Sequence, residues 1–60
     1  MADDEKTVEQ AAREFVEQYG ADAIHILSER AEVADNLDDA LAAKAWRDIA
    51  GAAERMLTQR

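Results

Sequence analysis

Apolar residues recur at helical spacing in three stretches of the chain, with polar and charged residues at the positions between them. Positions i, i+3, i+4 and i+7 lie on one face of an α-helix, and each stretch follows that period. Gly20 separates the first stretch from the second, and the Asn-Leu-Asp-Asp segment 36–39 separates the second from the third. The pattern predicts an all-α fold of three short amphipathic helices over about residues 7–19, 22–36 and 38–58.

Residues with capping chemistry mark the predicted helix ends. Thr7, with a glutamine three residues later, fits a capping box and is expected to be the N-cap of the first helix. Gly20 suits the left-handed residue that follows a helix C-terminus. We expect Asp22 to cap the second helix, and Asn36 or Asp38 to cap the third.

The apolar positions of the second helix cover about half of its circumference. So wide an arc predicts a central helix that contacts two neighbours. The short connection after it predicts that the second and third helices form an antiparallel hairpin, in which Arg30 lies opposite Trp46. Gly51 costs about 1 kcal/mol relative to alanine, so we expect the third helix to continue through it, and a break there is the alternative.

Length and composition predict a single domain with a thin core. The chain has 60 residues, and much of its 48% hydrophobic content is alanine, which adds little buried area. There is no cysteine, so no disulfide can add stability. We expect residues 1–6 to form a frayed acidic N-terminus, and residues 7–60 to form a single helical domain. Such a domain would gain burial by assembling into a dimeric helical bundle or by docking on another protein.

The surplus apolar surface is expected on the second helix and on the neighbouring flank of the third. Arg30 lies inside the apolar arc of the second helix, where three roles are open. Its stem can lie along apolar surface with the charged head in water, its guanidinium can stack on Trp46, or it can contact a partner. The candidate interface residues are Ile26, Arg30, Val33, Trp46, Met56 and Leu57.

One helical face carries the residues that could bind a metal ion. His25 shares this face with Asp22, Glu29 and Glu32, and one histidine with carboxylates could hold a metal between two copies. The chain has a single histidine and no Glu-x-x-His motif. We therefore favour a solvated acidic face, and expect neither a metal nor another cofactor.

The net charge is −7, and most acidic residues precede residue 40. The third helix instead carries Lys44, Arg47 and Arg55 on one outward face. These bases are too few to hold a phosphate backbone against the net charge, so we expect no direct nucleic-acid binding. We expect them to balance the helix C-terminus and to pair with acidic neighbours.

The residue content argues against catalysis and against a membrane span. The chain has one serine, no cysteine and no glycine-rich phosphate loop, so we expect no enzyme and no catalytic residues. No run approaches the ~18 apolar residues of a membrane span, and the acidic N-terminus lacks the apolar region of a signal peptide. We therefore expect a cytoplasmic protein that does not contact the membrane.

Three short elements form a pattern spread over about residues 11–57. They are Tyr19-Gly20-x-Asp22-Ala23, Arg30-Ala31 and Trp46-x-x-Ile49. In these elements the chain resembles a group of very short uncharacterised helical proteins, mainly from alphaproteobacteria. Those proteins have a Gly-Asp turn where this chain has residues 36–39. The resemblance implies a helical architecture and no activity, and it carries over Gly20, Arg30 and Trp46.

Taken together, these features favour a small non-enzymatic helical protein–protein interaction module, either homo-oligomeric or accessory to a larger protein. The alternative is an acidic regulator, of the antitoxin or inhibitor type, that binds a basic or nucleic-acid-binding protein.

Overall fold

Three helices make up the chain as the computed structural model describes it, with the backbone of residues 3–58 and the side chains of residues 7–58. They are α1 (Asp3–Tyr19), α2 (Asp22–Asn36) and α3 (Ala40–Thr58), and these residues include no strand. The predicted all-α fold is confirmed, and α3 runs without a break through Gly51. No helix in the described part of the chain is long and apolar enough to cross a membrane.

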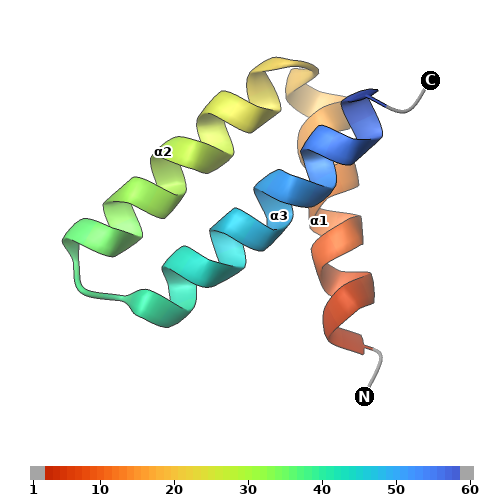
Figure 1. Ribbon diagram of the computed structural model, residues 1–60. Helices are drawn as coiled ribbons and strands as arrows, with labels where there is room; N and C mark the ends of the chain where they lie inside the picture. Colours follow the sequence, from red (N-terminus) through yellow and green to blue (C-terminus); the bar gives the residue numbers. More distant parts are fainter. Residues whose placement is uncertain (1–2, 59–60) are drawn as a thin grey trace.

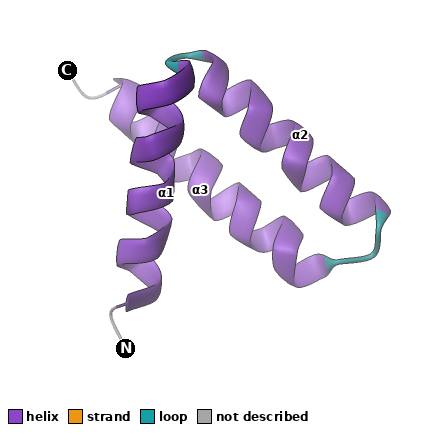
Figure 2. Cartoon of the chain, turned by 180° about the vertical axis from the view of Figure 1, so that it is seen from behind, coloured by secondary structure: helices purple, strands orange, loops and turns teal. Residues whose placement is uncertain are grey.

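The predicted antiparallel hairpin of α2 and α3 is also confirmed, and the two helices lie side by side along its length (Figure 1). Seen from behind, α1 crosses the end of the hairpin that is remote from the α2–α3 turn (Figure 2). The expectation that the second helix is central is wrong, because α3 packs against both other helices and α2 contacts α1 least. The wide apolar arc of α2 does not reflect a second neighbour, since Val33 is 56% exposed and Leu37 74% exposed.

The beginning of α1 differs from the prediction. The helix begins at Asp3, so Thr7 lies inside it and is not its N-cap. Residues 3–6, expected to fray, belong to its first turns, and residues 1–2 lie outside the described part of the chain.

Gly20 ends α1 as predicted. It has a φ of 60°, and its N–H donates to the carbonyl oxygen of Val16 at 2.7 Å, which is the hydrogen bond of an αL C-terminal cap. The expected capping of α2 by Asp22 is wrong. Ala21 occupies the N-cap position without a side-chain hydrogen bond, and Asp22 is the first residue of the helix, where its charge still favours the dipole.

The turn after α2 is a Schellman motif built on an aspartate. Asp38 has a φ of 60°, and its N–H donates to the carbonyl of Asp35 at 3.0 Å. The N–H of Asp39 reaches back to the carbonyl of Ala34 at 2.9 Å. These two bonds satisfy carbonyls that the end of a helix leaves without partners.

Asp39 then caps α3, because its Oδ1 accepts the N–H of Ala42 at 3.1 Å. The prediction named Asn36 or Asp38 for this role and is wrong on both. Asn36 is the last residue of α2, and Asp38 occupies the left-handed position of the turn. Asp39 directly precedes the first residue of α3, and its side chain reaches the N–H three residues later.

Small side chains form most of the core. Leu27 is the one large side chain that is fully buried among the described residues, and it clusters with alanines from α1 and α3. Alanine lets helices approach closely, while larger side chains pack around the cluster with part of their surface exposed. The buried cluster is Ala12, Leu27, Ala52 and Ala53.

We predict that Leu27→Ala lowers the free energy of unfolding by about 2–5 kcal/mol, because it opens a cavity where the three helices meet. A domain of this length has a total stability of only about 3–9 kcal/mol at about 0.05–0.15 kcal/mol per residue, so the loss should be plain in urea unfolding followed by circular dichroism. Leu41→Ala is the matched control. Leu41 is 84% exposed, so a comparable loss there would contradict the assignment of Leu27 as the centre of the core.

We also predict that Asp38→Gly raises the free energy of unfolding by about 0.5–1 kcal/mol. Glycine adopts a φ of 60° without the steric cost of a side chain, and the change removes a negative charge from the C-terminal end of α2. Thermal unfolding measures the gain. Asp38→Ala removes the charge and keeps a Cβ, so equal stabilisation by both substitutions would show that the backbone conformation contributes nothing.

Candidate protein-interaction surface

A groove between α2 and α3, close to their turn, brings together three of the six predicted interface residues. Arg30 and Val33 contribute from α2, and Trp46 contributes from α3. We call it the hairpin groove, and its lining is Arg30, Val33, Ala34, Leu37, Asp39, Ala42 and Trp46.

The other three predicted residues do not line the hairpin groove. Met56 packs against the buried cluster, to which α1 contributes Ala12. Ile26 and Leu57 are half-buried and lie outside the groove. The crossing of α1 over α3 therefore uses part of the apolar surface that the sequence assigned to a partner.

Two adjacent faces of α2 explain why the groove is apolar. The first face is buried and consists mostly of alanine around Leu27. The residues of the second face are four, three and four positions apart along the chain. Its two members nearest the turn, Val33 and Leu37, remain exposed. The buried face is Ala23, Leu27, Ala31 and Ala34. We call the second face the exposed stripe; it consists of Ile26, which is half-buried, the exposed residues Arg30 and Val33, and the exposed C-cap residue Leu37.

Arg30 lies over the ring of Trp46, with its Cζ 5.8 Å from the ring centroid. The predicted pairing of these two residues across the hairpin is confirmed. Arg30 is nevertheless an exposed residue, and it forms no ion pair with any residue of the described part of the chain. Its guanidinium thus lies over an aromatic face while its charge stays available to water or to a partner.

Aromatic rings extend from the groove toward α1. Trp46 meets the ring of Phe15 edge-on, with centroids 6.2 Å apart and planes at 89°. Phe15 in turn contacts Tyr19 at 5.8 Å, and Tyr19 is 46% exposed. Phe15, Tyr19 and Arg30 share the lining of a second hollow on the α1 side. Arg30 therefore lies at the boundary between this hollow and the hairpin groove.

Sequence reasoning missed two residues of this surface, Leu37 and Asp39. Leu37 belongs to the apolar arc of the second helix and was not named as an interface residue, although it is 74% exposed. The spacing from Arg30 to Val33 to Leu37 was the available signal, because it describes a stripe separate from the one that contains Leu27. Asp39 could not be separated from its neighbours in the turn without the backbone conformation.

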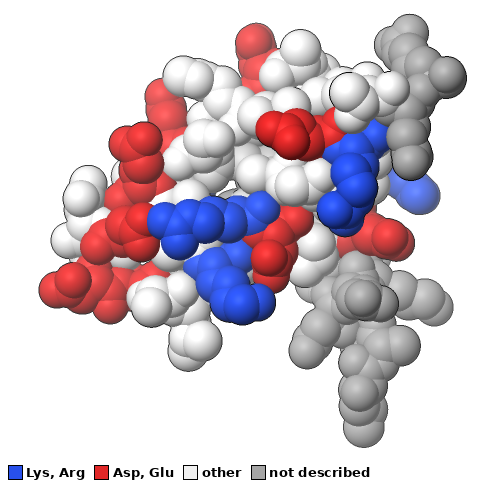
Figure 3. All heavy atoms as spheres, in the orientation of Figure 1, with Lys and Arg blue, Asp and Glu red and all other residues white. Residues whose placement is uncertain are grey.

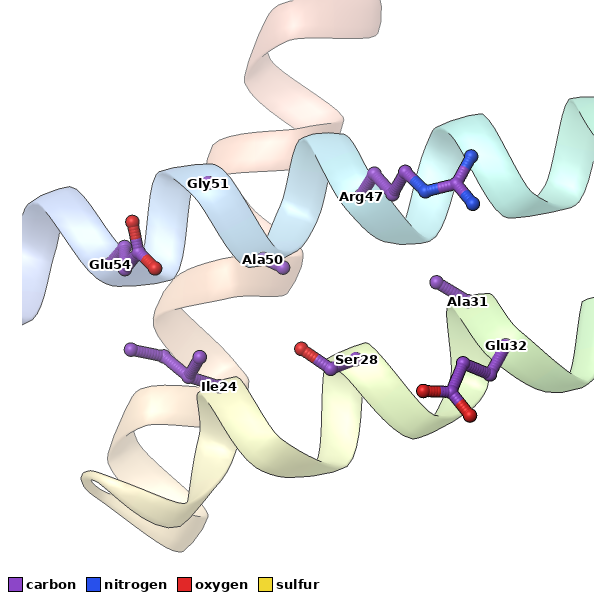
Figure 4. Close-up of a pocket in the computed structure, with 8 residues that line it drawn as sticks. All are labelled: Ile24, Ser28, Ala31, Glu32, Arg47, Ala50, Gly51 and Glu54. Atoms are coloured by element: carbon purple, nitrogen blue, oxygen red, sulfur yellow. The ribbon is translucent and has the colours of Figure 1, made fainter.

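A further groove lies between α2 and α3 nearer the α1 end of the hairpin (Figure 4). Ile24 and Ser28 rise from α2 toward α3, and the opposite wall includes Ala50 and Gly51. A methyl group added at Gly51 would meet no atom within 4 Å, so this groove is open. Glu32, Arg47 and Glu54 border it, and its charges have mixed sign.

The face considered for a metal holds an exposed pair instead. His25 Nε2 lies 3.0 Å from Glu29 Oε2, and these side chains are 78% and 66% exposed. Within the described residues, no three histidine, cysteine, aspartate or glutamate side chains lie close enough together to hold a metal ion.

Lysine and arginine side chains gather over α3, and acidic side chains follow the outer edge of α2 and the hairpin end (Figure 3). The expected pairing of the α3 bases with acidic neighbours is confirmed at two of them. Lys44 Nζ lies 3.3 Å from Asp48 Oδ2, and Arg47 forms an ion pair with Asp35 of α2. Exposed pairs of this kind contribute about 0–1 kcal/mol each, so they orient the surface more than they stabilise the fold.

No family model matches this chain, and no curated protein or solved structure matches it either. The resemblance to short alphaproteobacterial proteins stays a prediction.

We predict that Arg30→Ala changes the fluorescence emission of Trp46, the only tryptophan of the chain, and lowers stability by about 0.5–1 kcal/mol. The physical reason is the loss of the guanidinium that lies above the ring. Arg55→Ala removes the same charge from the exposed face of α3 and serves as the control. An unchanged Trp46 spectrum in Arg30→Ala would contradict the stacking.

Proposed function

We propose that this chain is a small non-enzymatic protein–protein interaction module, and that the hairpin groove is its docking site. The observation that carries the proposal is the exposure of Val33 and Leu37, at 56% and 74%, beside the half-buried Trp46. A contiguous exposed apolar surface in a small protein is typical of an interaction site. Aromatic and arginine side chains such as Trp46 and Arg30 are the types that contribute most to binding energy at interfaces.

The thin core supports the same proposal. Only one large apolar side chain is fully buried in the described part of the chain, so much of the apolar surface of α2 contributes nothing to the isolated fold. Covering it with a partner would add burial of the kind that dominates association. The partner can be another copy of this chain or a larger protein.

A second candidate is a regulator that binds a basic protein through its acidic surface. The observation that favours it is the run of exposed carboxylates on α2, in a chain with a net charge of −7. This mode of binding would use the outer edge of α2 and leave the hairpin groove open. The exposed carboxylates are Asp22, Glu29, Glu32 and Asp35.

Salt separates the two candidates. We predict that partners retained by the immobilised full-length chain survive a rise in NaCl from about 50 mM to 500 mM, since apolar contacts are not screened and charges are. Leu37→Lys should release those partners, because it places a charge on the apolar stripe. Leu41→Lys at the neighbouring exposed position is the matched control.

Binding that is lost at high salt and is indifferent to Leu37→Lys would support the acidic regulator instead. In that case Glu29→Gln together with Glu32→Gln should weaken it. If no interaction of the chain, with itself or with another protein, depends on Leu37, the proposed function fails.

A further inference from the structure

The hairpin groove carries one charge of each sign, and the two charges stand at opposite ends. Arg30 lies at the end toward α1, and Asp39 lies at the end formed by the turn. Between them the groove is apolar, with Val33, Leu37 and Trp46 as its larger members. Its own net charge is therefore zero, although the chain as a whole carries −7. Such a groove offers nothing specific to a basic partner.

A surface with this order of charges is complementary to itself. A two-fold axis through the middle of the groove exchanges its ends, so that a cation on one copy meets an anion on the other. We propose that the partner in the hairpin groove is a second copy of this chain, related by a two-fold axis near Val33, with Arg30 of each copy paired to Asp39 of the other. The inference rests on the proposed function, because it names the occupant of the same docking site.

The exposed stripe of α2 fits this arrangement. Its members Arg30, Val33 and Leu37 all line the hairpin groove, so they follow one another along the same surface toward the turn. Antiparallel pairing centred at Val33 and Ala34 sets Arg30 opposite Leu37. The arginine stem then packs on leucine, and its guanidinium reaches past Leu37 to the turn residue Asp39.

Both charged groups can bind the partner while they keep their contacts within their own chain. Arg30 stacks on Trp46 through its ring contact, and it has no ion pair within the described part of the chain. Asp39 caps α3 through Oδ1, and a carboxylate offers about four lone-pair sites on its two oxygens, so it can accept an arginine as well. The pair would join groups that are already held in place.

The same rotation also gives the exposed turn a contact. It carries the partner's turn, with Leu37, toward the hollow that Phe15 and Tyr19 line on the α1 side. A stable interface buries at least about 600 Å² on each partner, which is about an eighth of the 4749 Å² surface of this chain. The groove and this hollow together provide one continuous surface for it.

The test measures the oligomeric state of the full chain by sedimentation equilibrium over a wide concentration range. A dimer is expected, and Arg30→Glu should weaken it by about tenfold or more, because the new carboxylate then faces Asp39. Arg55→Glu makes the same charge change on the far face of α3 and should leave the dimer unchanged. Asp39→Asn should also weaken the dimer, and asparagine keeps the capping oxygen, so the fold is preserved.

A cross-link fixes the position of the axis. The chain has no cysteine, so Val33→Cys introduces a single thiol that meets its own copy only if Val33 lies near the two-fold axis. Under mild oxidation, Val33→Cys should form a covalent dimer rapidly, and Ser28→Cys, from the further groove, should not. Circular dichroism of every variant checks that the monomer fold is kept.

A chain that stays monomeric at millimolar concentration overturns the inference. So does a dimer that is indifferent to Arg30→Glu, or one that cross-links through Ser28→Cys and not through Val33→Cys. The proposed function survives each of these results if another protein binds in a manner that depends on Leu37, so its failure and the failure of this inference are distinguishable.

Discussion

Leu27 packs against alanines where the three helices meet, and the rest of the structure depends on that contact. Alanine at Ala12, Ala52 and Ala53 lets α1 and α3 approach closely enough to enclose the leucine completely. Larger side chains such as Phe15 and Met56 pack around this centre and remain partly exposed. The fold is thus organised around a small contact, and it leaves much apolar surface at the other end of the hairpin.

The position of α1 decides where that surface lies. Because α1 crosses the hairpin at the end remote from the α2–α3 turn, the half with the turn consists of two helices with no third one over them (Figures 1 and 2). Arg30 and Trp46 mark the edge of the covered half, where one residue stacks on the other and both face the hairpin groove. Beyond them the exposed stripe continues to the turn. The same geometry that completes the core therefore creates the candidate docking site.

The sequence predicted the helices and their pairing better than their caps and neighbours. Helical periodicity gave three segments, and the mirror symmetry of a short turn placed Arg30 opposite Trp46. Capping could not be assigned because consecutive acids and amides in the segment 36–39 offer nearly equal side-chain chemistry, and only the backbone conformation selects Asp39. Periodicity also shows which side of a helix is apolar, but it does not show which element packs against that side. Met56 was therefore assigned to an interface, although the crossing of α1 over α3 places it against the core.

The pairing of α1 with α3, rather than with its neighbour α2, has a consequence for the order in which the chain folds. The α2–α3 hairpin is joined by a turn of three residues, so its contacts close short loops at low entropic cost. Contacts between α1 and α3 connect the two ends of the sequence across the whole of α2, and they close the longest loops in the molecule. We therefore expect the hairpin to form first, and α1 to dock afterwards and enclose Leu27. Local opening that releases α1 would expose the centre of the core while leaving the hairpin paired.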